Sequence, residues 1–116
     1  MDLSPVGTIS EHSLQVQIVM VLRKAGIYVF AIPNGGKRAA ITGQLLKAEG
    51  VLPGVADLFI PEYRLFLEVK TAAGRLSDVQ RIFCDEICKL GYRYAVVRSL
   101  EEVYNLVEAC RNDRDI

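Results

Sequence analysis

The sequence predicts an α/β domain in which a mixed central sheet is flanked by helices. Helix-like and strand-like segments alternate along the chain, two of the strand-like segments are joined by a short turn, and apolar residues recur every three or four positions in the helix-like ones. The expected order of elements is α-β-α-β-β-α-β-α. A chain of 116 residues predicts one domain over residues 1–116, with residues 112–116 as a frayed tail.

The first half of the chain predicts a helix, a strand and a shorter helix. Residues 8–11 (TISE) fit a capping box, and the helix behind them ends at Gly26. Its apolar positions are Leu14, Ile18, Val21, Leu22 and Ala25. Residues 27–32 predict a buried strand that stops at Pro33. A glycine-rich basic loop over residues 34–38 precedes a short helix over residues 39–49.

The second half predicts a hairpin, a helix, a strand and a last helix. Residues 56–60 and 64–70 are the hairpin strands, with a turn at residues 61–63. Ser77 and Gln80 form a second capping box. The helix behind it carries an apolar stripe of Val79, Ile82, Phe83, Ile87 and Leu90. Residues 92–98 predict a strand, and Ser99 with Glu102 caps a helix whose apolar residues are Val103, Leu106, Val107 and Cys110.

Composition narrows the class of protein. The 14 basic and 14 acidic residues cancel, which counts against a protein that holds nucleic acid by charge alone but not against one whose basic rim is offset by metal-binding acids. No apolar run approaches the roughly 20 residues of a membrane span, and the basic start of a signal peptide is missing, so we expect a cytoplasmic protein. Cys84, Cys88 and Cys110 are expected to be free thiols, because a zinc site needs further ligands and His12 is the only histidine.

The hairpin carries the most informative side chains. Strand alternation places Glu68 and Lys70 on one face, and counting outward from the turn places Asp57 opposite them. Two converging carboxylates suit Mg²⁺ or Mn²⁺, and the backbone carbonyl of Val69 adds a further oxygen. Lys70 is suited to orient a water or to neutralise charge during phosphodiester cleavage. The alternative is a structural cluster that solvates a sheet edge.

Other candidates have two readings each. Glu11 lies on the apolar stripe of the first helix, where it either approaches a metal or serves the capping box, and Gln80 either caps or reaches a water or phosphate. His12 is expected to be a solvated helix residue. Flanking basic residues are phosphate contacts or ordinary surface charge, and the strand tyrosines are expected to pack rather than to stack on bases. The flanking basic residues are Lys37, Arg38, Lys47 and Arg75, and the strand tyrosines are Tyr28, Tyr63 and Tyr94.

Taken in order, these motifs resemble the VRR-NUC family of the PD-(D/E)XK nuclease superfamily, from about Glu11 to Val97. The resemblance rests on Glu11 and on residues 32–35 (IPNG), 50–58 (GVLPGVADL), 68–70 (EVK) and 74–80 (GRLSDVQ). The family usually has proline where this chain has Ala56, a change that leaves the carboxylate of Asp57 in place.

The resemblance implies a restriction-endonuclease-like fold and a Mg²⁺- or Mn²⁺-dependent nuclease. In it Asp57 and Glu68 would bind the metal, Lys70 would assist the nucleophile, and Glu11 and Gln80 would complete the site. The chain looks like the free-standing members, often virus-encoded, which would place it in the cytoplasm of a host cell. Such members resemble Holliday-junction resolvases, so the resemblance implies a homodimer that cleaves branched DNA during recombination or repair. The rival readings are a DNA-binding module with little catalysis of its own, and a nuclease for unbranched DNA.

Overall fold

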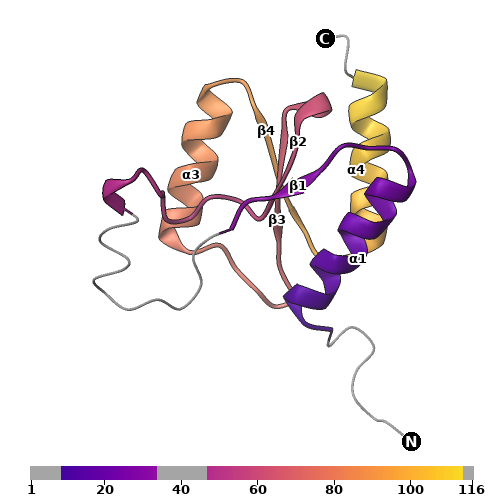
Figure 1. The fold of residues 1–116 in the computed structure, drawn as a ribbon, viewed down its shortest axis with the longest axis horizontal. Helices are drawn as coiled ribbons and strands as arrows, with labels where there is room; N and C mark the ends of the chain where they lie inside the picture. The colour runs from indigo at the N-terminus through magenta and orange to yellow at the C-terminus, as the bar shows by residue number, and fades with distance from the viewer. Residues whose placement is uncertain (1–8, 34–46, 114–116) are drawn as a thin grey trace, which may run out of the picture.

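A four-stranded mixed sheet forms the centre of the protein, with helices on both of its faces. The computed structural model describes residues 9–33 and 47–113. Figure 1 shows α3 on one side of the sheet and α1 and α4 together on the other. The strand order is β1-β2-β3-β4, with β1–β2 and β2–β3 antiparallel and β3–β4 parallel. The predicted α/β class is therefore confirmed.

Each predicted element that falls on described residues is present, with small shifts at its ends. The elements are α1 (Glu11–Lys24), β1 (Phe30–Ala31), β2 (Leu58–Ile60), a 3₁₀ turn (Pro61–Tyr63), β3 (Leu65–Val69), α3 (Asp78–Lys89), β4 (Arg93–Val97) and α4 (Leu100–Asp113). Residues 47 and 48 are helical, but most of the helix predicted over residues 39–49 lies outside the described residues. None of the described helices is both long enough and apolar enough to cross a bilayer.

The core lies on the face of the sheet that α1 and α4 cover. The alternating residues Leu65, Leu67 and Val69 of β3 are buried there, against Leu58 and Ile60 of β2. The helices contribute Leu14, Ile18, Leu22, Val103, Val107 and Cys110. Complete burial of these side chains on one face leaves the opposite face of the same strands free to carry other chemistry.

The hairpin between β2 and β3 has the predicted register. Its 3₁₀ turn ends at Arg64, which adopts a left-handed conformation with φ of 50° and donates its N–H to the carbonyl of Pro61. Leu58 pairs with Leu67, so Asp57, one position further from the turn, faces Glu68. The prediction that Asp57 lies opposite the Glu68–Lys70 segment follows from this register.

Three local predictions are wrong. The N-cap of α1 is Ser10, which accepts from the N–H of Ser13, so Glu11 is the first helical residue rather than the returning member of a capping box. Residues 27–32 form an alternating edge segment instead of a buried strand, since Tyr28 and Phe30 are exposed at β1, the edge strand of the described sheet. Three of the five residues of the apolar stripe predicted for this helix are also exposed, namely Val79, Ile82 and Leu90.

The carboxyl-terminal helix is longer than predicted. Residues 112 and 113, which the sequence predicts to fray, are the last residues of α4, while 114–116 lie outside the described residues. Its amino-terminal cap agrees with the prediction, since the N–H of Glu102 donates to Ser99 Oγ at 3.2 Å. Cys84, Cys88 and Cys110 are free thiols, as expected.

Candidate active site

The two candidate metal-binding carboxylates meet where β2 begins and β3 ends. Asp57 immediately precedes β2, and its Oδ2 accepts the backbone N–H of Val69 at 2.7 Å. In an extended strand, the N–H and the C=O of one residue point to the same side, so the Val69 carbonyl also faces Asp57. Glu68 directly precedes Val69 on β3, and alternation along the strand places its side chain on the face opposite the core. The hairpin therefore brings Asp57, Glu68 and the Val69 carbonyl together, as the sequence predicts.

Glu68 is the one buried charged residue of the described chain, with 2% of its surface exposed. One of its oxygens, Oε2, accepts the side-chain N–H of Gln80 at 3.1 Å and lies 3.8 Å from Lys70 Nζ. The other, Oε1, is buried and has no hydrogen-bond partner among the described residues. A carboxylate that is held by one oxygen and left open at the other is suited to receive a cation.

Burial and a neighbouring carboxylate change the protonation of Glu68. Desolvation is the largest cause, followed by the neighbouring Asp57 carboxyl group, and together they raise the pKa of Glu68 from 4.5 to about 8. Lys70 opposes this shift, and Glu11 adds slightly to it. At neutral pH the metal-free site therefore retains a proton, which a divalent cation would replace. The hard-oxygen donors and the open Oε1 fit such an ion.

Gln80 forms the predicted capping box and also contacts Glu68, while its reach to a water or a phosphate stays a prediction. The side-chain Oε1 of Gln80 accepts the backbone N–H of Ser77 at 2.8 Å. The backbone N–H of Gln80 donates to Ser77 Oγ at 3.3 Å, which completes the capping box. Its Nε2 is then left to donate to Glu68. The cap thus fixes the side chain of Gln80 in the orientation that holds the carboxylate.

Gly54 allows the loop before Asp57 to lie directly against the first turn of α3. It has φ of +87°, and a Cβ atom built there would lie 2.4 Å from the Val79 carbonyl oxygen. Only glycine combines this conformation with this approach. The contact fixes the distance between the loop that carries Asp57 and the helix that carries Gln80.

Glu11 lies at the rim of the site rather than within it. It is exposed, contrary to the inward position predicted from its helical spacing, because it begins α1 at the end of the sheet. Its Oε2 is nevertheless 3.5 Å from the position of a Cβ atom on Gly74, and Lys70 packs against the same glycine. Residues 9–33 and 47–113 contain no group of three or more acidic, histidine or cysteine side chains that could hold an ion. A direct metal contact by Glu11 stays a prediction.

Arg98 holds the loop between Lys70 and α3, a role that the sequence did not indicate. Its guanidinium donates to the carbonyls of Thr71 and Gly74 at 2.7 and 2.6 Å. The two bonds are charge-assisted and lie in a partly buried position, so they restrain the backbone next to Lys70. An arginine directly after a strand is too common to have marked this role.

The basic residues proposed to contact phosphate are only partly described. Lys37 and Arg38 lie outside the described residues. Lys47 and Arg75 are exposed, and neither belongs to an ion pair within the described chain. Their side chains are therefore accessible to a ligand. His12 is exposed as expected.

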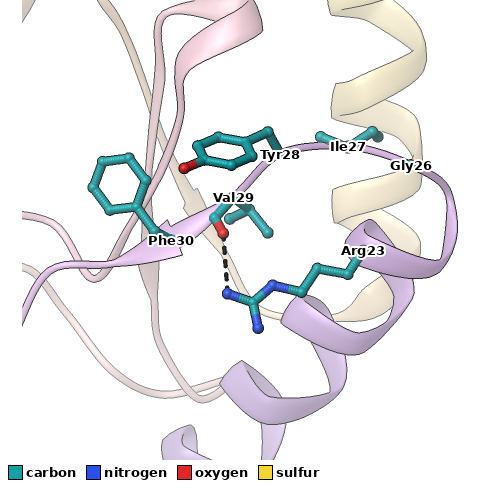
Figure 2. Close-up of a pocket in the computed structure, with 6 residues that line it drawn as sticks. All are labelled: Arg23, Gly26, Ile27, Tyr28, Val29 and Phe30. Atoms are coloured by element: carbon teal, nitrogen blue, oxygen red, sulfur yellow. Dashed lines mark hydrogen bonds between the residues drawn. The ribbon is translucent and has the colours of Figure 1, made fainter.

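The strand tyrosines do not behave alike. Tyr63 is buried and Tyr94 is half-buried, in agreement with a packing role, but 73% of the surface of Tyr28 is exposed. Tyr28 and Phe30 border a pocket of about 500 Å³ at the β1 edge. Figure 2 shows their rings on one side of the strand, while Arg23 reaches the Val29 carbonyl from the other side, at 3.3 Å. The ring of Tyr28 contacts that of Phe30, with the centroids 6.4 Å apart, so its packing is limited to this edge of the described sheet.

Comparison with known proteins agrees with the fold and the motifs. The family model of the VRR-NUC domain matches residues 9–101. A solved structure of a VRR_NUC domain protein shares 19% sequence identity, with 86% of each chain covered and a TM-score of 0.72, which is a likeness of fold. No curated protein matches the chain. Since the family model spans most of the sequence, the chain belongs to the VRR-NUC family, whose domains are nucleases of the PD-(D/E)XK type.

Proposed function

We propose that this nuclease domain is a Mg²⁺- or Mn²⁺-dependent endonuclease that cleaves branched DNA, such as four-way junctions, as a homodimer. The observation that supports metal-dependent cleavage best is the buried Glu68 carboxylate, which shares a proton-retaining site with Asp57 and keeps Oε1 open. A buried carboxylate beside a second acid is costly without a cation, and groups with such perturbed pKa values are concentrated at functional sites.

The side chains divide the work of the reaction between them. Asp57 and Glu68 would hold the cation, with the Val69 carbonyl beside them, and the bound ion would polarise a phosphoryl oxygen and lower the pKa of an attacking water. Lys70 is held near this position by its 3.8 Å approach to Glu68, and only 12% of its side chain is exposed. Its ammonium group would orient the water and neutralise charge that develops on the phosphate. Gln80 keeps Glu68 in one rotamer.

Two substitutions test the site. Asp57→Ala and Lys70→Ala should each abolish cleavage of plasmid or junction DNA in Mn²⁺, while circular dichroism shows an unchanged fold. Lys89→Ala is a matched control, because Lys89 is an exposed lysine in the last turn of α3. Cleavage by either site variant at the rate of the control would contradict the assignment.

The branched substrate is tested by comparing DNA structures at equal concentration. A four-way junction should be cut faster than a flap or a linear duplex of the same sequence in Mg²⁺ and in Mn²⁺. Equal rates on all three would contradict the preference for branches. Junction binding in Ca²⁺, followed by no cutting after Mn²⁺ is added, would instead identify a DNA-binding module.

We place the dimer contact at the exposed edge of the sheet. Edge strands carry unpaired backbone groups, and at β1 the rings of Tyr28 and Phe30 add exposed apolar surface to them. Tyr28→Asp should therefore shift the mass measured by light scattering towards that of a monomer. Tyr104→Asp, on the exposed face of α4, is the control. A wild-type protein that is monomeric at micromolar concentration would refute the homodimer.

A further inference from the structure

Tyr94 reaches the site from a strand that carries none of the predicted site residues. It lies on β4, where the parallel register pairs it with Phe66 and pairs Val96 with Glu68. Paired residues share a face, so Tyr94 and Glu68 are diagonal neighbours beneath α3. The ring of Tyr94 packs against Phe83, with the ring centroids 6.2 Å apart. This contact sets the direction of the ring relative to the site.

Two buried side-chain atoms in the described chain have no hydrogen-bond partner, and they belong to these two neighbours. One is the hydroxyl oxygen of Tyr94, and the other is Glu68 Oε1. Buried polar groups in folded proteins are almost always paired with protein or with ordered water. A hydroxyl that can donate and a carboxylate that can accept are complementary, and a gap that is too wide for a direct bond is typically bridged by water.

The electrostatic environment of the hydroxyl agrees with this neighbourhood. Burial is the largest influence on the pKa of Tyr94 and raises it, and the charges of Glu68, Cys84 and Asp57 raise it further, in that order. The hydroxyl of Tyr94 therefore keeps its proton. A protonated hydroxyl in this position acts as a donor towards the carboxylates.

We propose that Tyr94 is a positioning residue whose hydroxyl donates, through one buried water, to Glu68 Oε1. This bond would leave a second lone pair of Oε1 for the cation and would hold the carboxylate plane in the orientation for metal binding. Together with Gln80 on Oε2, it would restrain Glu68 at both oxygens. The inference rests on the proposed function, because it assigns Tyr94 to the metal-binding acid of that site.

A purely structural role for Tyr94 would need only its ring and not its hydroxyl. The ring belongs to an aromatic cluster on the α3 face that also includes Phe59, Phe66, Phe83 and Tyr92. Phenylalanine would serve that packing equally well and would remove an unpaired buried group. Tyr94→Phe therefore separates the hydroxyl from the ring.

The matched control is Tyr92→Phe. Tyr92 stands two positions earlier, joins the same cluster through Phe59 and Phe66, and packs its ring under the Arg64 guanidinium at 4.1 Å. All three of these contacts involve the ring. Removing this hydroxyl tests the general effect of a tyrosine-to-phenylalanine change in the cluster.

The experiment measures Mn²⁺ binding to the full chain by calorimetry without DNA, together with cleavage as a function of Mn²⁺ concentration. Tyr94→Phe should bind Mn²⁺ about 10-fold to 100-fold more weakly than the wild type, and Tyr92→Phe should bind like the wild type. The cleavage rate of Tyr94→Phe should return to the wild-type value at saturating Mn²⁺, with an unchanged melting temperature in EDTA.

The possible failures are distinguishable. Equal Mn²⁺ affinity of Tyr94→Phe and wild type would overturn the role of Tyr94 and leave the proposed function intact. Equal weakening in Tyr94→Phe and Tyr92→Phe would also overturn it, in favour of packing. A wild-type protein that binds Mn²⁺ no better than Asp57→Ala would overturn both the metal-dependent function and this inference.

Discussion

Replacing Glu68 by glutamine should stabilise the metal-free protein at pH 8 and change it little at pH 5. In the folded protein, burial and Asp57 raise the pKa of Glu68 from 4.5 to about 8, so the folded state holds a proton that the unfolded chain releases. Stability falls with rising pH wherever the folded state binds more protons. The contribution of protonated Glu68 to the free energy of unfolding is therefore fully present below pH 4.5 and is lost as the pH rises to about 8. Glutamine has no proton to lose.

The size of the effect follows from the shift. One proton that is held only in the folded state corresponds to a slope of about 1.4 kcal/mol per pH unit. As the pH rises from the unfolded to the folded pKa, the free energy of unfolding of the wild type would fall by up to about 4 kcal/mol relative to that of Glu68→Gln. For a domain of this size, that difference corresponds to a change in melting temperature of roughly 10–20 °C.

Urea denaturation in EDTA at pH 5, 6, 7 and 8 measures this difference. The control is Glu86→Gln, because Glu86 is an exposed residue of α3 whose ion pair with Lys89 adds little to stability. Its free energy of unfolding should follow that of the wild type at each pH. If the wild-type and Glu68→Gln curves run parallel from pH 5 to pH 8, Glu68 does not hold the proton and the electrostatic account of the site is wrong.

Three further changes test the supports of the site. Gly54→Ala should lower the free energy of unfolding by more than about 2 kcal/mol, because it combines an unfavourable positive φ with a clash. Gly26 has a similar φ with open space around it, so Gly26→Ala should lower the melting temperature less. Arg98→Ala should lower the free energy of unfolding by about 1–3 kcal/mol, because it leaves the Gly74 carbonyl unpaired while the Thr71 carbonyl keeps the N–H of Gly74; an unchanged melting temperature would contradict its role. Gln80→Leu removes the donor to Glu68 without adding charge, so calorimetry should show weaker Mn²⁺ binding, with about 1 kcal/mol of stability lost because the capping box is also removed; equal binding would refute the role of Gln80.

The parts of the site that depend on local geometry could be predicted from the sequence. Strand alternation and the position of one turn are sufficient to bring Asp57 opposite Glu68 and to place Lys70 beside it. The capping box at Ser77 is equally local, since it depends on a spacing of three residues. These features need no knowledge of how distant segments pack.

The features that the sequence did not indicate depend on distant contacts. The approach of Tyr94 to Glu68 follows from the parallel register of β3 and β4, and the helix α3 lies between those strands in the sequence. The exposure of Tyr28 depends on which part of the sheet the helices leave uncovered.

The core and the candidate site occupy opposite faces of the same two strands, and this arrangement explains how so unfavourable a pair of acids is tolerated. Leu58, Leu67 and Val69 are buried on one face, and their burial fixes β2 and β3 independently of the acids. The carboxylates are therefore held close together by packing on the other side of the sheet, although their own interaction is repulsive without a cation. A site held in this way is already arranged for an ion before the ion arrives. Mn²⁺ should accordingly stabilise the wild type at pH 8, where the proton is lost, and should have much less effect on Glu68→Gln.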